Sequence, residues 1–140
     1  MRFFLVVLLL LPVAAQAAPP ELTVVKPWMR YLLPHIPAAA YMVLQNPGAA
    51  EVVVTGAASP ACGMLMLHKS TDASGMAMMM DVPSLTVPAH GSVALAPGGY
   101  HLMCLQPTMK LGEQVPVTLS LRDGSTVTAH LPVYGAQNAP

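Results

Sequence analysis

The stretch VPVTLSLRDGSTVTAHLPV, residues 115–133, carries the clearest β-hairpin signal in this 140-residue sequence. Short runs rich in Val, Leu and Thr occupy residues 115–121 and 126–133, and both have the composition of β-strands. Between them stands Asp123-Gly124, a residue pair suited to the tight turn that joins two antiparallel strands. The stretch therefore predicts a hairpin.

The same pattern continues through the rest of the chain. Fifteen prolines and ten glycines leave almost no stretch of helical length, and further turns are predicted at Asn46-Pro47-Gly48, Ala89-His90-Gly91 and Pro97-Gly98-Gly99. The predicted strands are 22–26, 40–45, 51–56, 64–68, 76–80, 85–87, 92–96, 100–105, 115–121 and 126–133. Many short strands at this spacing predict an all-β Greek-key sandwich or small barrel.

The first residues have the three regions of a secretory signal peptide. Arg2 precedes an apolar run over residues 3–11, and Ala15 and Ala17 supply the small side chains wanted before a cleavage site. The run is shorter than the roughly 20 residues that span a bilayer, and no cysteine near the site suggests a lipid anchor. We expect a signal peptide over 1–17, one domain over 18–134, and a disordered tail over 135–140.

Charge and composition narrow the kinds of partner. Without Arg2, five Lys and Arg face six Asp and Glu, so nothing points to nucleic acid or to an anionic membrane surface. Only 9% of residues are charged and 54% are hydrophobic, which predicts an exposed apolar patch of the kind that marks contact sites. We expect an exported, soluble monomer that does not insert into a membrane after signal cleavage.

Four residues form a pattern typical of a metal site: His68, ten residues, Met79, twenty-one residues, His101, one residue, Met103. Thioether sulfur and imidazole suit copper(I), whereas such a neutral set does not suit zinc, magnesium or calcium. In a strand, His101 and Met103 share a face with Cα atoms about 6.5 to 7 Å apart. Leu102 and Cys104 would then point to the opposite side, toward the core.

The other two ligands depend on a loop. His68 ends the predicted strand 64–68, Met79 lies in 76–80, and a loop over 69–75 would return the chain to the same end of the fold. The four ligands would then form a site at the rim of a sandwich. On spacing alone Met76, Met78 or Met80 could replace Met79.

Methionine is concentrated in this region. Six of the eleven lie between residues 64 and 80, namely Met64, Met66, Met76, Met78, Met79 and Met80. Methionine can fill an irregular core or form a promiscuous binding surface. Alternation from His68 nevertheless places Met66 and Met64 on the histidine face. We treat Met66, Met64 and Met78 as candidate auxiliary metal ligands.

The remaining polar residues give weaker signals. His35 and His90 are expected in exposed turns and His130 in a structural role. The sequence has no paired carboxylates for general acid–base catalysis and no nucleophile motif around Ser92 or Ser120, so it predicts no enzyme.

Cys62 and Cys104 could pair in an oxidising compartment. Strand parity puts them on opposite faces, however, which argues against a bond. The sequence leaves this pairing open.

Several motifs resemble the periplasmic copper chaperones called PCuAC. The intervals between His68, Met79, His101 and Met103 match that family throughout, and the similarity extends over most of the chain after the signal peptide. Further similar segments are residues 65–68, 87–89, Leu95, 97–103 and 115–119, with looser similarity at Trp28, 38–41 and Met42. The sequence departs from the family at Met80, where a basic residue is common, and at the two cysteines.

This resemblance implies a cupredoxin-like β fold that binds one copper(I) ion through the four side chains. It also implies transfer of copper in the periplasm to an accepting protein, most often toward the dinuclear copper site of cytochrome c oxidase, through an oxidase subunit or its assembly factor.

Two other functions stay open at this stage. An electron-transfer cupredoxin would need a cysteine thiolate beside two His and a Met, and Cys104 is the candidate. A metal-free secreted domain would use its methionines as a binding surface or as oxidation sites.

Overall fold

The computed structural model describes residues 12–14, 21–73 and 75–140, and within these residues it contains ten β-strands and no helix. The strands are β1 (Thr23–Arg30), β2 (Ala38–Asn46), β3 (Val52–Ala58), β4 (Met64–Ala73), β5 (Met76–Asp81), β6 (Leu85–Val87), β7 (Gly91–Leu95), β8 (Tyr100–Leu105), β9 (Gln114–Leu121) and β10 (Thr126–Tyr134). Each predicted strand overlaps one of them, so the all-β prediction is confirmed. The predicted signal peptide, residues 1–17, lies outside the described residues except for 12–14.

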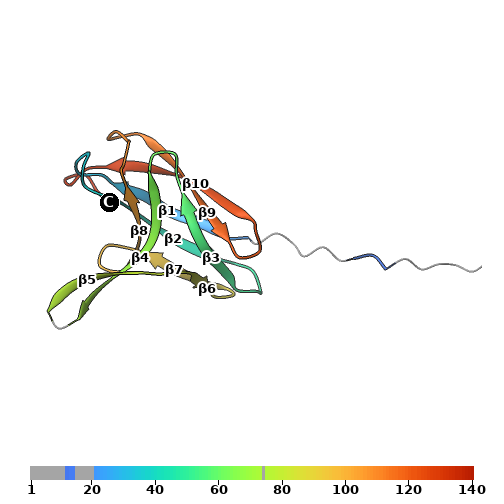
Figure 1. Cartoon of the computed structure of the whole chain (residues 1–140). Helices are drawn as coiled ribbons and strands as arrows, with labels where there is room; N and C mark the ends of the chain where they lie inside the picture. The colour runs from blue at the N-terminus through green and yellow to red at the C-terminus, as the bar shows by residue number, and fades with distance from the viewer. Residues whose placement is uncertain (1–11, 15–20, 74) are drawn as a thin grey trace, which may run out of the picture.

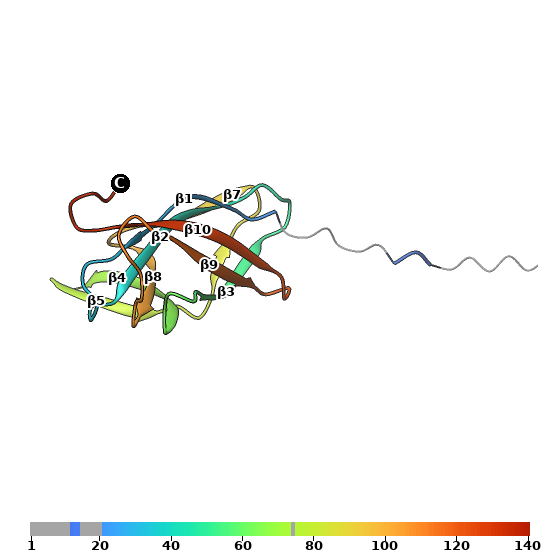
Figure 2. The ribbon, with the colours of Figure 1, turned by 90° about the horizontal axis from the view of Figure 1, so that it is seen from above.

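The strands follow the order β5-β4-β8-β7-β2-β1-β10-β9-β3-β6, and β2 also pairs with β8 (Figures 1 and 2). The strand β10 links the two layers of the sandwich, because it pairs antiparallel with β9 over residues 126–132 and parallel with β1 at Val133 and Tyr134. The sandwich expected from the sequence is therefore present.

The hairpin of β9 and β10 turns where the sequence predicts. Gly124 adopts φ 87°, which glycine tolerates without strain, and Asp123 Oδ1 accepts hydrogen bonds from the Ser125 hydroxyl at 2.6 Å and from its backbone N–H at 2.9 Å. The Ser125 side-chain and backbone hydrogen bonds lower the pKa of Asp123 from its ordinary value of 3.8. The turn is thus held by the ionised carboxylate.

Both layers contribute to one apolar core. Met29 of β1, Leu44 of β2 and Leu102 of β8 come from one layer, and Val117 of β9 and Leu131 of β10 come from the other. Each of the five is at most 1% exposed. Because Leu102 points into the core, its neighbours His101 and Met103 on β8 project from the outer face of the sheet. The core thereby fixes which face of β8 carries the candidate ligands.

Cys62 and Cys104 form a disulfide, which corrects the parity argument. Cys62 lies in the turn between β3 and β4 rather than in a strand, so alternation does not set the direction of its side chain. Cys104 points into the core and is fully buried, as predicted. The bond ties the turn before β4 to β8.

The loop expected over residues 69–75 is wrong. The strand β4 continues to Ala73 and pairs with β5, with Lys69 opposite Met80 and Thr71 opposite Met78. Backbone pairing with β5 extends β4 through these residues, so most of the predicted loop is strand. The resulting β4–β5 hairpin projects from one end of the sandwich (Figure 1).

The first strand extends further than predicted, whereas the prediction for the C-terminal tail is not tested. The strand β1 runs on to Arg30, past Pro27, through an irregularity between Val25 and Trp28 where Lys26 takes φ 50°. Residues 135–140 form no strand, and their predicted disorder stays a prediction.

Candidate metal centre

The candidate ligands come together through the pairing of β4 with β8. In this antiparallel register His68 stands opposite His101, and Met66 stands opposite Met103. Paired residues of neighbouring strands share a face, so all four side chains project from the outer face of the sheet. The two imidazole rings lie 5.8 Å apart, centroid to centroid, at an interplanar angle of 84°.

His101 is oriented by its own strand. Its side chain is 5% exposed, and Nδ1 lies 3.2 Å from the carbonyl oxygen of Gly99. Because a carbonyl oxygen only accepts hydrogen bonds, Nδ1 carries the proton, and Nε2 keeps the lone pair that binds a metal. A hydrogen bond of this kind fixes both the tautomer and the direction of a ligating histidine.

His68 is buried, at 7% exposed, yet lacks a well-formed hydrogen bond. Asp81 Oδ1 lies 2.7 Å from Nε2, but the contact does not have the alignment of a hydrogen bond, so both ring nitrogens remain without a partner. Buried polar groups in proteins are almost always paired. An unpaired buried imidazole on this face is therefore well suited to bind a ligand.

Register also decides among the methionines of β5. His68 is opposite Asp81 and Ser70 is opposite Met79, so Asp81 and Met79 share the histidine face. Met76, Met78 and Met80, which the spacing alone allowed, alternate onto the other face. Of the four β5 methionines, Met79 is thus the one on the histidine face, and it is 60% exposed.

The candidate auxiliary ligands are placed differently from one another. Met66 is half-buried and directly opposite Met103. Met64 shares that face but is 55% exposed and stands opposite Leu105. Met78 lies on the opposite face from His68. Of the three auxiliary candidates, Met66 is therefore the one that is paired directly with a predicted ligand, Met103.

An aromatic cluster borders the histidine pair on the side of β2 and β1. The Tyr41 ring lies 6.5 Å from His101 and 4.7 Å from Trp28, and both aromatic residues are buried. The Arg30 guanidinium carbon sits 5.3 Å from the Trp28 ring centroid and 5.6 Å from that of Tyr41, within range of a cation–π interaction. This cluster shields the histidines from water on one side.

Sequence reasoning missed Asp81 and the aromatic cluster. Asp81 lies two residues after Met79, and so on its face, but the predicted strand ended at Met80. The position of Tyr41 beside His101 depends on the pairing of β2 with β8, which no short motif reveals.

The other histidines lie apart from this centre. His35, His90 and His130 are exposed, in the loop before β2, in the turn before β7 and on β10 respectively. None of them is brought to the His68–His101 face.

Both cysteines of the chain are in the disulfide, so neither offers a thiolate. This corrects the alternative of an electron-transfer cupredoxin, which needs a Cys ligand. Across the described ranges no group of three or more His, Cys, Asp or Glu could hold a metal. A site of three or more ligands on the His68–His101 face would therefore need thioethers.

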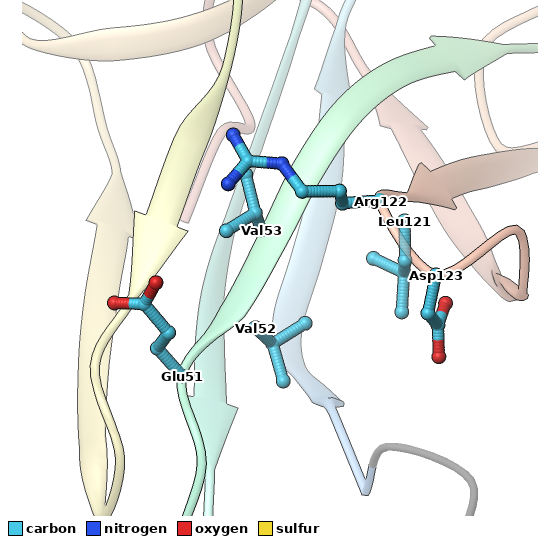
Figure 3. Close-up of a pocket in the computed structure, with 6 residues that line it drawn as sticks. All are labelled: Glu51, Val52, Val53, Leu121, Arg122 and Asp123. Carbon is cyan, nitrogen blue, oxygen red and sulfur yellow. The ribbon is translucent and has the colours of Figure 1, made fainter.

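A pocket elsewhere on the surface is lined by Glu51, Val52, Val53, Leu121, Arg122 and Asp123 (Figure 3). It lies at the start of β3 and beside the β9–β10 turn and contains neither His nor Met. It is separate from the candidate metal centre.

Within the part of the chain that the structure describes, no helix is long and apolar enough to cross a membrane.

Residues 22–133 match the model of a family described as "Putative lipoprotein LpqE-like". The chain belongs to the LpqE-like family. A relative of this LpqE-like chain, "Putative lipoprotein Lxx21020" from Leifsonia xyli subsp. xyli, is 36% identical over 98 residues, which is 68% of the chain. The match spans 59% of the relative's length.

Solved structures share the fold of this LpqE-like chain. The copper-bound PCuAC domain from PmoF2 has a TM-score of 0.69 at 20% identity, covering 85% of this chain and 97% of that domain. The solution structure of CuI-DR1885 from Deinococcus radiodurans has a TM-score of 0.61 at 34% identity, covering 88% and 83% respectively. These matches confirm the PCuAC resemblance predicted from the sequence.

Proposed function

We propose that this LpqE-like protein binds one copper(I) ion through His68, Met79, His101 and Met103 and transfers it to another protein. The observation that carries the proposal is the direct opposition of His68 and His101 on adjacent strands, with Met66, Met103 and Met79 on the same outer face. Two imidazoles and soft thioethers form a neutral donor set that suits copper(I).

The chemistry of the donors also favours release. Copper(I) tolerates two, three or four ligands, so bonds can be exchanged one at a time. As each bond from copper to an imidazole or thioether breaks, a bond to a thiolate of the acceptor forms, and copper stays in the +1 state. Cysteine thiolates bind copper(I) more strongly than neutral thioethers, which drives transfer toward such an acceptor.

The similarity to CuI-DR1885, whose name states the bound copper(I), supports the metal and its oxidation state. The lipoprotein name of the LpqE-like family supports a location in the cell envelope. We place this protein in the periplasm and the acceptor at the dinuclear copper site of cytochrome c oxidase, as the PCuAC resemblance implies.

An anaerobic titration with copper(I) against a competing chelator tests the proposal. We expect one tight equivalent, with X-ray absorption reporting two nitrogen and two sulfur neighbours. Mixing the loaded protein with the soluble copper-binding domain of the oxidase subunit should then move copper to that domain. If no tight equivalent forms, the proposed function fails. If binding occurs but copper stays on the loaded protein, the proposed acceptor is wrong.

A further inference from the structure

The strand β5 carries thioethers on both of its faces. Met79 belongs to the histidine face, whereas Met76, Met78 and Met80 alternate onto the opposite face, with Met78 opposite Thr71 and Met80 opposite Lys69. We call Met76, Met78 and Met80 the thioether ladder. The His/Met centre proposed above does not use these three residues.

The thioether ladder lies outside the hydrophobic core. Met76, Met78 and Met80 are 68%, 53% and 55% exposed and are absent from the hydrophobic core cluster. The strand β5 stands at the edge of the sheet, on the hairpin that projects from the sandwich (Figure 1). Because these apolar side chains gain little from burial, core packing does not account for them.

Strand geometry allows neighbouring members of the ladder to share one ion. Met78 lies about 6.5 to 7 Å, Cα to Cα, from Met76 and from Met80, and flexible thioether side chains reach across that separation. Met76 and Met80 are about 13 Å apart, too far to hold one ion between them. Met78 therefore belongs to both possible pairs.

We propose that the thioether ladder is a second, weaker copper(I) site, in which Met78 and one neighbouring methionine bind the ion as a two-coordinate pair. The proposal rests on the proposed function, because the ion is the same cargo. Thioether sulfur is a soft neutral ligand that selects copper(I) over harder cations. Binding is by ligand exchange alone, with no change in oxidation state.

Electrostatics favours the pair of Met76 and Met78. Lys69 stands opposite Met80, and its ammonium group is held 5.0 Å from the Tyr100 ring centroid. A cationic residue paired with Met80 disfavours a second cation there, whereas Met78 is paired with the neutral Thr71. Met76 with Met78 is the preferred pair.

The ladder is placed to load the His/Met centre. Met79 follows Met78 directly in the chain, and none of the strands that the structure describes covers the outer edge of β5. An ion held by Met78 is thus one residue away from a ligand of the centre and can pass around the open edge.

The test is a copper(I) titration of the protein, anaerobic and without chloride, followed by NMR of methionine methyl groups labelled with carbon-13. We expect the first equivalent to shift Met79 and Met103 and the second to shift Met76 and Met78. In Met78→Leu the second equivalent should bind at least tenfold more weakly while the first is unchanged. Met64→Leu, which removes an equally exposed methionine from β4, is the matched control and should keep the second equivalent.

Two results separate this site from the centre. The double variant His101→Ala/Met103→Leu should lose the tight equivalent and still show shifts at Met76 and Met78. If Met78→Leu binds the second equivalent as the parent does, or if Met64→Leu weakens it equally, the ladder is not a site. If the parent protein itself binds no tight first equivalent, the proposed function is contradicted instead.

Discussion

His68 and His101 face each other across β4 and β8, with ring centroids 5.8 Å apart and each side chain more than nine-tenths buried. Both strands lie inside the sheet, flanked by other strands along this stretch, so the distance between the two histidines is set by backbone pairing rather than by a loop. Side chains on paired strands are held in position more precisely than side chains on loops. In the proposed centre the two histidines are preorganised by strand pairing, and Met79 on the projecting hairpin is the proposed further ligand.

Replacing His101 should therefore remove most of the tight copper(I) binding. In His101→Ala we expect the affinity to fall about 100-fold or more, equivalent to about 2.8 kcal/mol, because Nε2 is the oriented donor. Competition with a copper(I) chelator measures the change. His130→Ala, an exposed histidine on β10, is the matched control, and an equal loss in both variants would contradict the assignment.

The thioethers should be partly redundant. Met79 is exposed on the edge strand, whereas Met66 stands opposite Met103, so either can serve as the fourth ligand. We expect Met66→Leu and Met79→Leu each to weaken copper(I) binding by less than about tenfold, and the double variant by more than the product of the two. Strict additivity in the chelator competition would show that Met66 does not share this role.

Much of the fold follows from local signals. The strands β6 and β8 match the predicted ranges 85–87 and 100–105, because Pro88 and the Pro97-Gly98-Gly99 turn mark their boundaries. The end of β1 was missed because Pro27 lacks the backbone donor that continued pairing needs, and the chain passes it only through a local irregularity with Lys26 at positive φ.

The site was predicted in its parts rather than in its arrangement. Alternation alone placed His101 and Met103 on one face and Leu102 inward. The opposition of His68 to His101, and of Met66 to Met103, depends on the register between strands that are more than thirty residues apart in the chain. No pattern within either strand encodes that register, and the same holds for the disulfide, whose first cysteine lies in a turn.

Asp81 should strengthen copper binding through its charge. Its carboxylate lies 2.7 Å from His68 Nε2 but is 89% exposed, so its attraction for the ion is strongly screened by water. We expect Asp81→Asn to weaken binding by at most about fivefold at low salt, and the difference should vanish in about 0.33 M potassium sulfate, whose ionic strength of about 1 M gives a Debye length of about 3 Å. Sulfate is used because chloride itself binds copper(I).

The salt series identifies what Asp81 does. A loss that persists at high salt would show that Asp81 acts as a ligand or fixes the His68 ring, rather than acting at a distance. Glu51→Gln, a carboxylate beside the pocket of Figure 3, is the matched control and should leave copper(I) affinity unchanged at every salt concentration.

The disulfide should matter for stability more than for the metal centre. Cys62 and Cys104 are 42 residues apart, and constraining a loop of that length in the unfolded chain is worth about 4 kcal/mol by the chain-entropy model. In Cys62→Ala/Cys104→Ala we expect the free energy of unfolding, measured with urea, to fall by about 2 to 5 kcal/mol. A stability unchanged within error would contradict this role.

Copper(I) affinity should respond much less to the same double substitution. Met103 precedes Cys104 in the chain, but β8 remains paired with β4 on one side and with β2 on the other, where Ala39 stands opposite Met103. These backbone pairs hold Met103 on the outer face without the disulfide, so we expect the affinity to change by less than about tenfold when it is measured under conditions where both proteins are folded. A loss of about 100-fold or more in a folded double variant would show that the disulfide, rather than strand pairing, positions Met103 in the centre.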